Sequence, residues 1–531
     1  MKTQVAGGRL IDPASGVDAV ADIWIADGVI VGIGARPLGF EADQRIDAAG
    51  RCVLPGLVDL SFTPGPQHDW QGAFAGGITT VAVADEAGEV GDANAASESR
   101  APASGSASSG SSSDAAVLPS ADEPIASKAR SPVASGGIAP GSGVVSRASN
   151  RSFAPRILRV GPMCSSVSGQ QLSDFGRLRQ AGCIAWSPGR PSSSSAATTP
   201  SDVAAGRGLD GNDPTGRGHP QSTYGQSTYG QSTYGQSTYG QSTGRPGSAG
   251  ADPHLLWRAM QYARGLGGAL WLPPVDAALA RGGVAGAGAY AARLALDSVP
   301  VVAETLALAQ IFALQRDTGA RVHLSQITSA EGVALVREAK REGLPITCDV
   351  AAHHLHVIDL DIGFYDPRYR LDPPLRGSRD RDALRAGLAD DTIDAVCSHH
   401  RVVAAEHADA PFAYAGAGAA DGPLLASLVL KWARETGVAP LQALAKITTG
   451  PAAVVAATQP ALPRAGRLEV GVPADFCVFD IDDFWLVPAG EARGAAPGTT
   501  FYGRTPFSGM PMTGRVTATF IHGECVWRAA Q

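Results

Sequence analysis

The chain has 531 residues, a formal net charge of −7 and 44% hydrophobic residues. This charge balance argues against nucleic acid or an anionic membrane as a partner, and no apolar run approaches the roughly 20 residues that a membrane helix needs. The seven cysteines are scattered, and the N-terminus lacks the apolar core of a signal peptide. We therefore expect a soluble, cytoplasmic protein with reduced cysteines.

The two ends of the chain are expected to be β-rich. Within residues 1–52, short apolar runs alternate with turns, and Asp27-Gly28 separates two of these runs. Asp-Gly at such a position predicts a hairpin, because both residues tolerate a positive φ. Strand character returns in residues 461–531. These two blocks predict one small sheet domain that is completed by both termini.

Two segments of biased composition interrupt the chain, at residues 88–153 and 190–251. The first is rich in Ala, Ser, Gly and Pro, and the second contains four tandem copies of Gln-Ser-Thr-Tyr-Gly between Gln221 and Gly240. Such segments bury too little apolar surface to offset the entropy lost on ordering, and a five-residue period is too short for a solenoid. We interpret both as low-complexity inserts. The alternative for the second is a tyrosine-bearing interaction segment.

Helix and strand patterns alternate in the rest of the chain, which comprises residues 53–87, 154–189 and 252–460. Strands are expected at residues 321–325, 344–350 and 393–397. Thr328 and Glu331 predict a capping box ahead of a helix that Gly343 ends. Repeated βα units of this kind predict a parallel sheet, either open or closed into a barrel.

Seven short motifs follow one another through these blocks: Pro55-Gly56-Leu57-Val58-Asp59, Gly76-Gly77-Ile78-Thr79-Thr80-Val81, Ala280-Arg281-Gly282-Gly283-Val284, His353-His354-Leu355, Asp372-Pro373-Pro374-Leu375-Arg376, Asp391-Thr392-Ile393-Asp394 and Thr505-Pro506-Phe507-Ser508-Gly509. In this order they resemble the dihydroorotases and hydantoinases of the amidohydrolase superfamily. The resemblance implies an α/β fold, with a TIM-like (β/α)8 barrel beside a small β-sandwich formed by both termini. It covers nearly everything except the two inserts.

The resemblance also implies a catalytic zinc centre at the C-terminal ends of the barrel strands, and its ligand positions are changed in this chain. The altered positions are Ser61, Thr63, Gly189, Pro273, Gln326 and His399. Ser61 and Thr63 stand in place of a His-x-His pair, and Gly189 falls at an acidic bridging ligand. Pro273 and Gln326 stand in place of histidines, and His399 stands in place of the aspartate that acts as general base. We therefore predict no catalytic, substrate-binding or metal-binding residue.

The substrate contacts that the resemblance implies are altered as well. Thr63 runs directly into Pro64-Gly65, which leaves no equivalent of the family's arginine. Two asparagine positions fall near Glu86 and at Asp372. Acidic groups at these positions would repel a dicarboxylate such as carbamoyl aspartate. This is a second argument against the family's reaction, independent of the metal.

Two histidine pairs remain near strand ends, His353-His354 and His399-His400. Neighbouring strand residues face opposite sides, so each pair offers at most one imidazole, and these two with Asp372 could form a site. Catalytic zinc usually has three protein ligands, and we expect structural histidines instead. The remaining candidates are expected to have structural roles: His323, Cys348, Asp349, Arg376 and Cys397.

The resemblance narrows to bacterial dihydroorotase-like chains that lack the metal-binding histidines and associate with aspartate carbamoyltransferase. It implies a non-catalytic structural or regulatory subunit in de novo pyrimidine biosynthesis. The partner would be the aspartate carbamoyltransferase catalytic chain, in a hetero-oligomer, and no cofactor would be needed. The alternative is a divergent dihydroorotase- or hydantoinase-type cyclic amidohydrolase that uses zinc. A third reading is an interaction module based on the inserts, with the barrel as its carrier.

Overall fold

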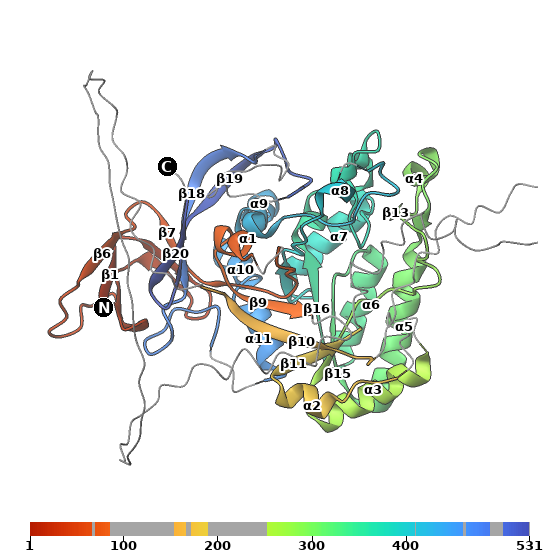
Figure 1. The fold of residues 1–531 in the computed structure, drawn as a ribbon, viewed down its shortest axis with the longest axis horizontal. Coiled ribbons are helices and arrows are strands. Elements are labelled where there is room, and N and C mark those ends of the chain that lie inside the picture. Colours follow the sequence, from red (N-terminus) through yellow and green to blue (C-terminus); the bar gives the residue numbers. More distant parts are fainter. Residues whose placement is uncertain are drawn as a thin grey trace, which may run out of the picture. The chain divides into compact units, whose positions relative to one another are not determined.

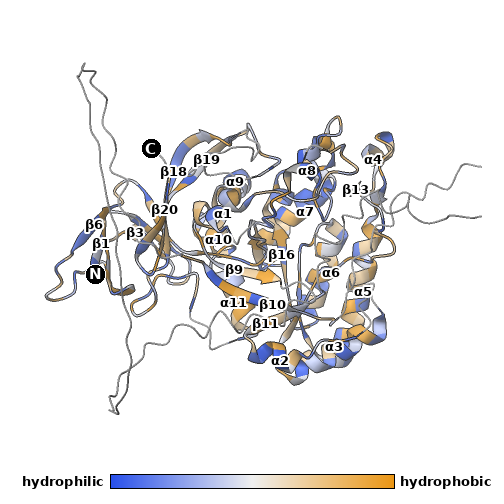
Figure 2. Cartoon of the chain, in the orientation of Figure 1, coloured by the Kyte–Doolittle hydropathy of each residue, from blue (hydrophilic) through white to orange (hydrophobic). Residues whose placement is uncertain are grey.

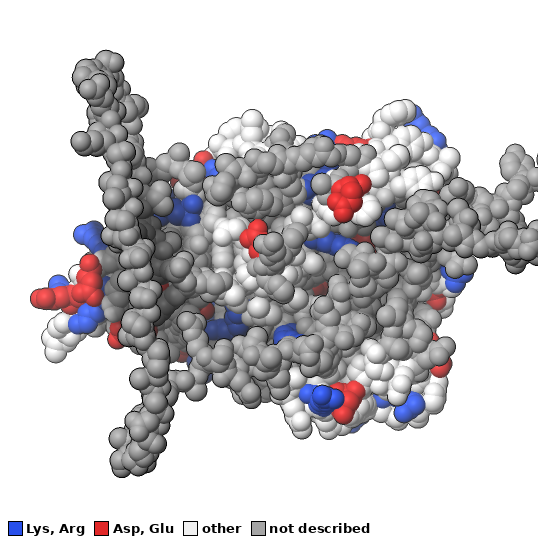
Figure 3. All heavy atoms as spheres, viewed as in Figure 1, with Lys and Arg blue, Asp and Glu red and all other residues white. Residues whose placement is uncertain are grey.

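The computed structural model describes residues 1–65, 69–84, 153–165, 171–188, 252–408, 410–459, 464–488 and 503–529. Phe153 apart, these residues belong to one compact unit formed by Met1–Val90 and Ala154–Gln531. The two predicted inserts lie outside the described residues, except for Phe153. Within the described part of the chain, no helix is long and apolar enough to cross a bilayer. Acidic and basic residues are interspersed on the face of the described chain seen in Figure 3.

An eight-stranded parallel sheet forms the centre of this unit (Figure 1). Its strands, in spatial order, are β8 (Leu57–Asp59), β9 (Ile78–Ala84), β10 (Arg156–Pro162), β11 (Cys183–Ser187), β12 (Ala269–Leu272), β15 (Arg321–Leu324), β16 (Ile346–Ala351) and β17 (Ala395–Cys397). Phe62 and His400 form a parallel bridge between the segments that follow β8 and β17. The sheet is therefore nearly closed, which confirms the predicted TIM-like (β/α)8 barrel.

Helices connect and cover the barrel strands. They are α1 (Gln71–Ala75), α2 (Phe175–Gln180), α3 (Pro253–Gly265), α4 (Ala289–Arg293), α5 (Val301–Thr318), α6 (Ala330–Arg341), α7 (Ser378–Ala389), α8 (Ala405–Ala408), α9 (Leu425–Thr436), α10 (Pro440–Ala445) and α11 (Thr449–Ala456). A short strand pair, β13 (Ala285–Gly286) and β14 (Ser298–Val299), flanks α4. Helix α3 packs through one apolar face (Figure 2). The residues of this face recur at helical spacing and are buried: Leu255, Leu256, Ala259, Met260 and Ala263.

The start of α6 differs from the prediction by one residue. Ser329, not Thr328, is the N-cap, and its hydroxyl accepts a hydrogen bond from the backbone N–H of Gly332 at 2.9 Å. The Thr328 hydroxyl is engaged elsewhere, because it accepts a hydrogen bond from Arg376 Nε at 3.1 Å and donates to the carboxylate of Glu304. The capping box predicted at Thr328 is therefore wrong. The predicted stop is confirmed, because Gly343 directly follows the C-cap residue Glu342 and has a φ of 88°.

Both termini build the two sheets of the small domain. One sheet has the order β5 (Val29–Ile33), β4 (Ile23–Ala26), β1 (Lys2–Ala6), β6 (Gln44–Asp47). The other has the order β20 (Glu524–Arg528), β19 (Pro511–Ile521), β18 (Phe476–Leu486), β7 (Cys52–Pro55), β2 (Arg9–Asp12), β3 (Val17–Val20). The chain ends meet where β7 and β18 pair antiparallel, with Leu54 opposite Cys477. This arrangement confirms the predicted β-sandwich from both termini.

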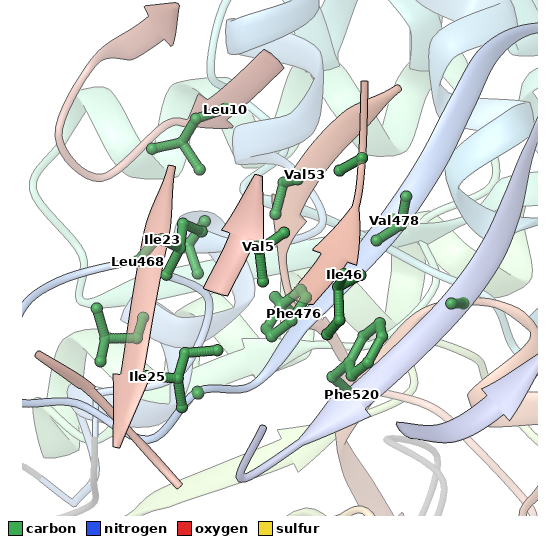
Figure 4. Packing of buried hydrophobic residues seen from close by; sticks show 14 of the residues in the cluster. Val5, Leu10, Ile23, Ile25, Ile46, Val53, Leu468, Phe476, Val478 and Phe520 are labelled. Atoms are coloured by element: carbon green, nitrogen blue, oxygen red, sulfur yellow. The ribbon is translucent and has the colours of Figure 1, made fainter. Parts of the chain in front are cut away.

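Apolar side chains from both ends of the chain fill the core of this domain (Figure 4). Ile23 and Ile25 come from the N-terminal segment, while Phe476 and Phe520 come from the C-terminal one and stack with ring centroids 4.5 Å apart. The predicted hairpin joins β4 to β5, with φ values of 48° at Asp27 and 80° at Gly28. Those positive values are the reason for the Asp-Gly pair.

Candidate functional site

The positions that the resemblance marks as altered ligands follow the C-terminal ends of barrel strands, except Gly189, which lies outside the described residues. Asp59, at the end of β8, is fully buried. Its carboxylate accepts hydrogen bonds from the backbone N–H groups of Ser61 at 3.2 Å and Ser398 at 3.0 Å, and another from the Ser398 hydroxyl. Burial raises the pKa of Asp59 to about 7, against the lowering effect of these hydrogen bonds. Asp59 therefore links the first barrel strand to the segment that follows the last one.

Ser61 and Gln326, two of the positions that the resemblance marks as altered ligands, contact each other. Gln326 follows β15, and its side-chain Nε2 donates to the Ser61 hydroxyl at 3.1 Å. The backbone N–H of Gln326 donates to Asp349 Oδ1 at 2.6 Å, and its φ is 60°, a strained value for a residue other than glycine. Structural and catalytic zinc sites use thiolate, imidazole or carboxylate ligands. A neutral hydroxyl–amide hydrogen bond stands here instead.

The remaining predicted positions are spread around the same end of the barrel. The backbone N–H of Thr63 donates to the carbonyl of His400 at 2.9 Å, so Thr63 takes part in barrel closure. Pro273 directly follows β12 and has no metal-binding atom in its side chain. His399 follows β17, is 95% buried and has a φ of 50°. Gly189 and Glu86 lie outside the described residues.

The first histidine pair sits in a short 3-10 helix, η4 (Ala352–Leu355), directly after β16. Strand alternation therefore does not separate the pair, and the two rings lie 4.7 Å apart. His353 Nδ1 is 3.0 Å from Asp421 Oδ2, and the hydroxyl of Thr505 donates to Asp421 Oδ1 at 2.5 Å. Burial, followed by the charge of His353, holds the pKa of His354 well below its usual range. These contacts fix the His353 imidazole, whereas both ring nitrogens of His354 are buried without a hydrogen-bond partner among the described residues and its ring packs against that of His353.

His400 and His323 also have structural surroundings. His400 stacks on Phe62 with centroids 4.4 Å apart and planes 7° apart, and its Nδ1 accepts from the backbone N–H of Gly422 at 3.1 Å. Burial lowers the pKa of His400 to about 4, so the ring is neutral near pH 7. His323 is 1% exposed, with Nδ1 2.9 Å from the Thr347 hydroxyl and Nε2 3.3 Å from Asp349. Both rings are held by neighbouring side chains and backbone.

The residues present do not fit the family's zinc centre. Within the described ranges, no group of three or more His, Cys, Asp or Glu side chains could hold a metal ion. His353 Nε2 is buried without a hydrogen-bond partner in those ranges, and the ring centroids of His353 and His399 are 6.0 Å apart. Two imidazoles are fewer than the three protein ligands of catalytic zinc. Cys348 and Cys397 are fully buried, and burial raises the pKa of both thiols. Both therefore stay protonated near pH 7 and do not offer a thiolate to a metal.

An open cavity of about 300 Å³ adjoins these residues, beside Gln326 and Pro273. Arg376, at its edge, donates to the Thr328 hydroxyl at 3.1 Å and to the carbonyl of Val299 at 2.8 Å, which agrees with the structural role expected for it. The motifs did not single out Arg370 or Glu304, which also line the cavity. No sequence signal marked them, because both lie outside the residues that carry the resemblance.

Comparisons with known proteins agree with the fold. The model of the amidohydrolase family matches residues 322–526. A dihydroorotase-like protein of Pseudomonas aeruginosa is 30% identical over 527 residues, which cover 99% of either chain. A dihydroorotase of Anaeromyxobacter sp. is 30% identical over 534 residues, covering 98% of this chain and 97% of that protein.

Solved structures are similar over the whole chain. A D-hydantoinase structure has a TM-score of 0.66 at 17% identity and covers 100% of this chain and 96% of its own. The L-hydantoinase from Arthrobacter aurescens has a TM-score of 0.64 at 18% identity, with the same coverage. The similarity to these two structures shows the fold, while the relatives at 30% identity show the family. The chain belongs to the amidohydrolase family, among dihydroorotase-like relatives.

Proposed function

We propose that this chain is a non-catalytic dihydroorotase homologue and serves as a structural or regulatory subunit of aspartate carbamoyltransferase in de novo pyrimidine biosynthesis. The observation that carries the proposal is the hydrogen bond from Gln326 Nε2 to the Ser61 hydroxyl at 3.1 Å. Two positions that hold metal ligands in the family are occupied by neutral groups that satisfy each other. A zinc ion would have to break this bond and would gain only weak ligands.

The closure of the barrel supports the same proposal, because it uses contacts that need no metal. Asp59 ties β8 to Ser398, and the backbone N–H of Thr63 donates to the carbonyl of His400 at 2.9 Å. A subunit that acts through its surface needs a stable fold rather than a reactive centre. The name of the Pseudomonas aeruginosa relative, a dihydroorotase-like protein, is compatible with this role.

Co-expression with an aspartate carbamoyltransferase catalytic chain tests the proposal. We expect the two chains to co-purify as a larger assembly, with higher carbamoyltransferase activity than the catalytic chain alone. Gln326→Ala is the matched variant: it removes the Gln326–Ser61 contact at a cost of about 1 kcal/mol, and it should leave assembly and carbamoyltransferase activity unchanged. An unchanged size and activity of the catalytic chain in the presence of the wild-type protein would contradict the proposal.

The second candidate is a divergent cyclic amidohydrolase. It is favoured by the dihydroorotase of Anaeromyxobacter sp., which is as similar over nearly the whole chain as the dihydroorotase-like relative. Metal analysis of the purified protein and assays with dihydroorotate and hydantoin separate the candidates. Stoichiometric zinc together with turnover would favour the hydrolase, whereas protein without zinc or turnover that still enlarges the carbamoyltransferase would favour the subunit.

A further inference from the structure

A cavity of about 390 Å³ lies at the N-terminal end of β10, whose first residue, Arg156, lines it. Residues of β8, β9 and β10 form its first wall: Val58, Thr80 and Leu158. Val58 and Leu158 belong to an apolar cluster that draws on strands all round the barrel, so this wall faces the barrel interior. Among the described residues, the cavity shares no lining residue with the one beside Gln326.

Helix α11 forms a second wall of this cavity. The helix packs against β8 and β17, and four of its residues line the cavity: Thr449, Ala452, Ala453 and Ala456. These positions recur at the three- and four-residue spacing of one helix face, so α11 turns that face toward the cavity. Because three of the four side chains are methyl groups, this wall is apolar and takes up little of the space beside it.

Three arginines border these apolar walls. The charged residues that line the cavity, among those that the structure describes, are Arg156, Arg464 and Arg467. Arg156 lies two residues before Leu158 on β10, so its side chain starts from the same inward-facing side of the strand. The three side chains are 21%, 63% and 34% exposed, so all of them are accessible. Accessible guanidinium groups beside an apolar surface suit an anion rather than a cation.

The carboxylates paired with these arginines do not balance their charge. Arg464 and Arg467 share the carboxylate of Glu469, with distances from Nη1 to Oε2 of 3.1 Å and 3.5 Å. Arg156 Nη2 is 3.6 Å from Asp475 Oδ2. Three guanidinium groups thus face two carboxylates, which leaves an excess of one positive charge. Glu469 is 47% exposed, so its ion pairs are weak and an anion with better geometry can compete with them.

We propose that this cavity binds a small organic phosphate monoester, with its phosphate on the three arginines and a short apolar body against Leu158 and α11. A phosphate monoester has three terminal oxygens, one for each guanidinium group, whereas a carboxylate has only two. The volume lies toward the lower end of the range for ligand pockets, so the organic part is small. This site goes beyond the proposed role as a subunit and does not depend on it, so either proposal can fail without the other.

Calorimetric titration of the full-length protein with three probes tests this site. Phenyl phosphate carries a phosphate monoester on an apolar ring, benzoate carries a carboxylate on the same ring, and inorganic phosphate lacks the ring. We expect phenyl phosphate to bind roughly tenfold more tightly than either of the other probes, a difference of about 1.4 kcal/mol. Benzoate or inorganic phosphate binding as tightly as phenyl phosphate, or no binding of phenyl phosphate, would overturn the proposal.

Substitutions at the rim and on the helical wall locate the site. Arg464→Gln should weaken phenyl phosphate binding about threefold, because it removes one exposed charge. Ala453→Leu should weaken it about tenfold, because it overfills the cavity without changing any charge, and leucine is a good helix former at this exposed position of α11. Arg281→Gln, an equal change of charge at an exposed residue of the cavity beside Gln326, is the control and should have no effect. Unchanged affinity in both Arg464→Gln and Ala453→Leu, or a loss of affinity in Arg281→Gln, would overturn the proposal.

Discussion

Replacing Asp59 by asparagine tests how the barrel is closed between β8 and β17. The Asp59 carboxyl is fully buried and receives hydrogen bonds from Ser61 and Ser398. Burial raises its pKa from the usual 3.8 to about 7. Asparagine has the shape of the protonated acid, and its amide can donate to the Ser398 hydroxyl while its oxygen accepts from the backbone. Asp59→Asn should therefore fold like the wild type and differ from it only in having no side chain at position 59 that takes up or releases a proton.

The sign of the effect follows from the raised pKa. The folded protein binds the proton of Asp59 more tightly than the unfolded chain does, so protonation stabilises the fold. This stabilisation is fully present below the unfolded pKa of 3.8 and is lost as the pH rises through about 7. A shift of this size corresponds to about 4 kcal/mol in total, and more than half of it is lost between pH 5 and pH 8.

Urea unfolding of the wild type and of Asp59→Asn at pH 5, 6, 7 and 8 provides the measurement. The difference between the two proteins cancels the other titrating groups. We expect the unfolding free energy of the wild type to fall relative to the variant by about 3 kcal/mol over this range. Parallel pH profiles would refute the reasoning. They would mean that the three hydrogen bonds to Asp59 keep it ionised in spite of its burial.

Three further substitutions test the contacts around the barrel. Glu304→Ala should cost about 3 kcal/mol of unfolding free energy, because the backbone and hydroxyl donors of Thr328 and Ser329, just before α6, would lose their acceptor. A melting temperature within a degree of the wild-type value would contradict this. Gly76→Ala should destabilise the protein by more than about 1 kcal/mol, since its Cβ would lie 2.2 Å from the carbonyl oxygen of Gly422; an unchanged melting temperature would argue against this close approach. Ser61→His combined with Gln326→His should still bind no stoichiometric zinc by metal analysis, because the other ligands remain changed, and one equivalent of zinc would disprove it.

Local chemistry made much of the fold predictable. The Asp27-Gly28 pair marks its hairpin because the two backbone conformations are restricted to such residues, and Gly343 ends α6 for the same reason. Alternating strands and helices indicated parallel βα units, and the resemblance supplied the closed barrel. These features depend on residues close together in the chain, where one sequence is sufficient.

The contacts that define the candidate site depend on residues far apart. Gln326 and Ser61 are separated by 265 positions, and Asp59 and Ser398 by 339. Their pairing follows from the register of the barrel, which sequence periodicity does not specify. The cap of α6 was misplaced for a related reason: Thr328 is engaged by Glu304, which lies 24 positions earlier. The resemblance predicts which ligand positions are changed, but the sequence does not predict the contacts that the residues at these positions make.

Gln326 connects two polar groups at the mouth of the barrel. A buried carboxylate that has no cation nearby needs other partners to remain in the core. Asp349 receives the backbone N–H of Gln326 at 2.6 Å on one oxygen, and its other oxygen lies 3.3 Å from His323 Nε2. The side chain of Gln326 meanwhile satisfies Ser61. One residue thus stabilises both a carboxylate and a hydroxyl at the mouth of the barrel. Gln326→His would remove the contact with Ser61 without completing the three protein ligands that catalytic zinc usually has.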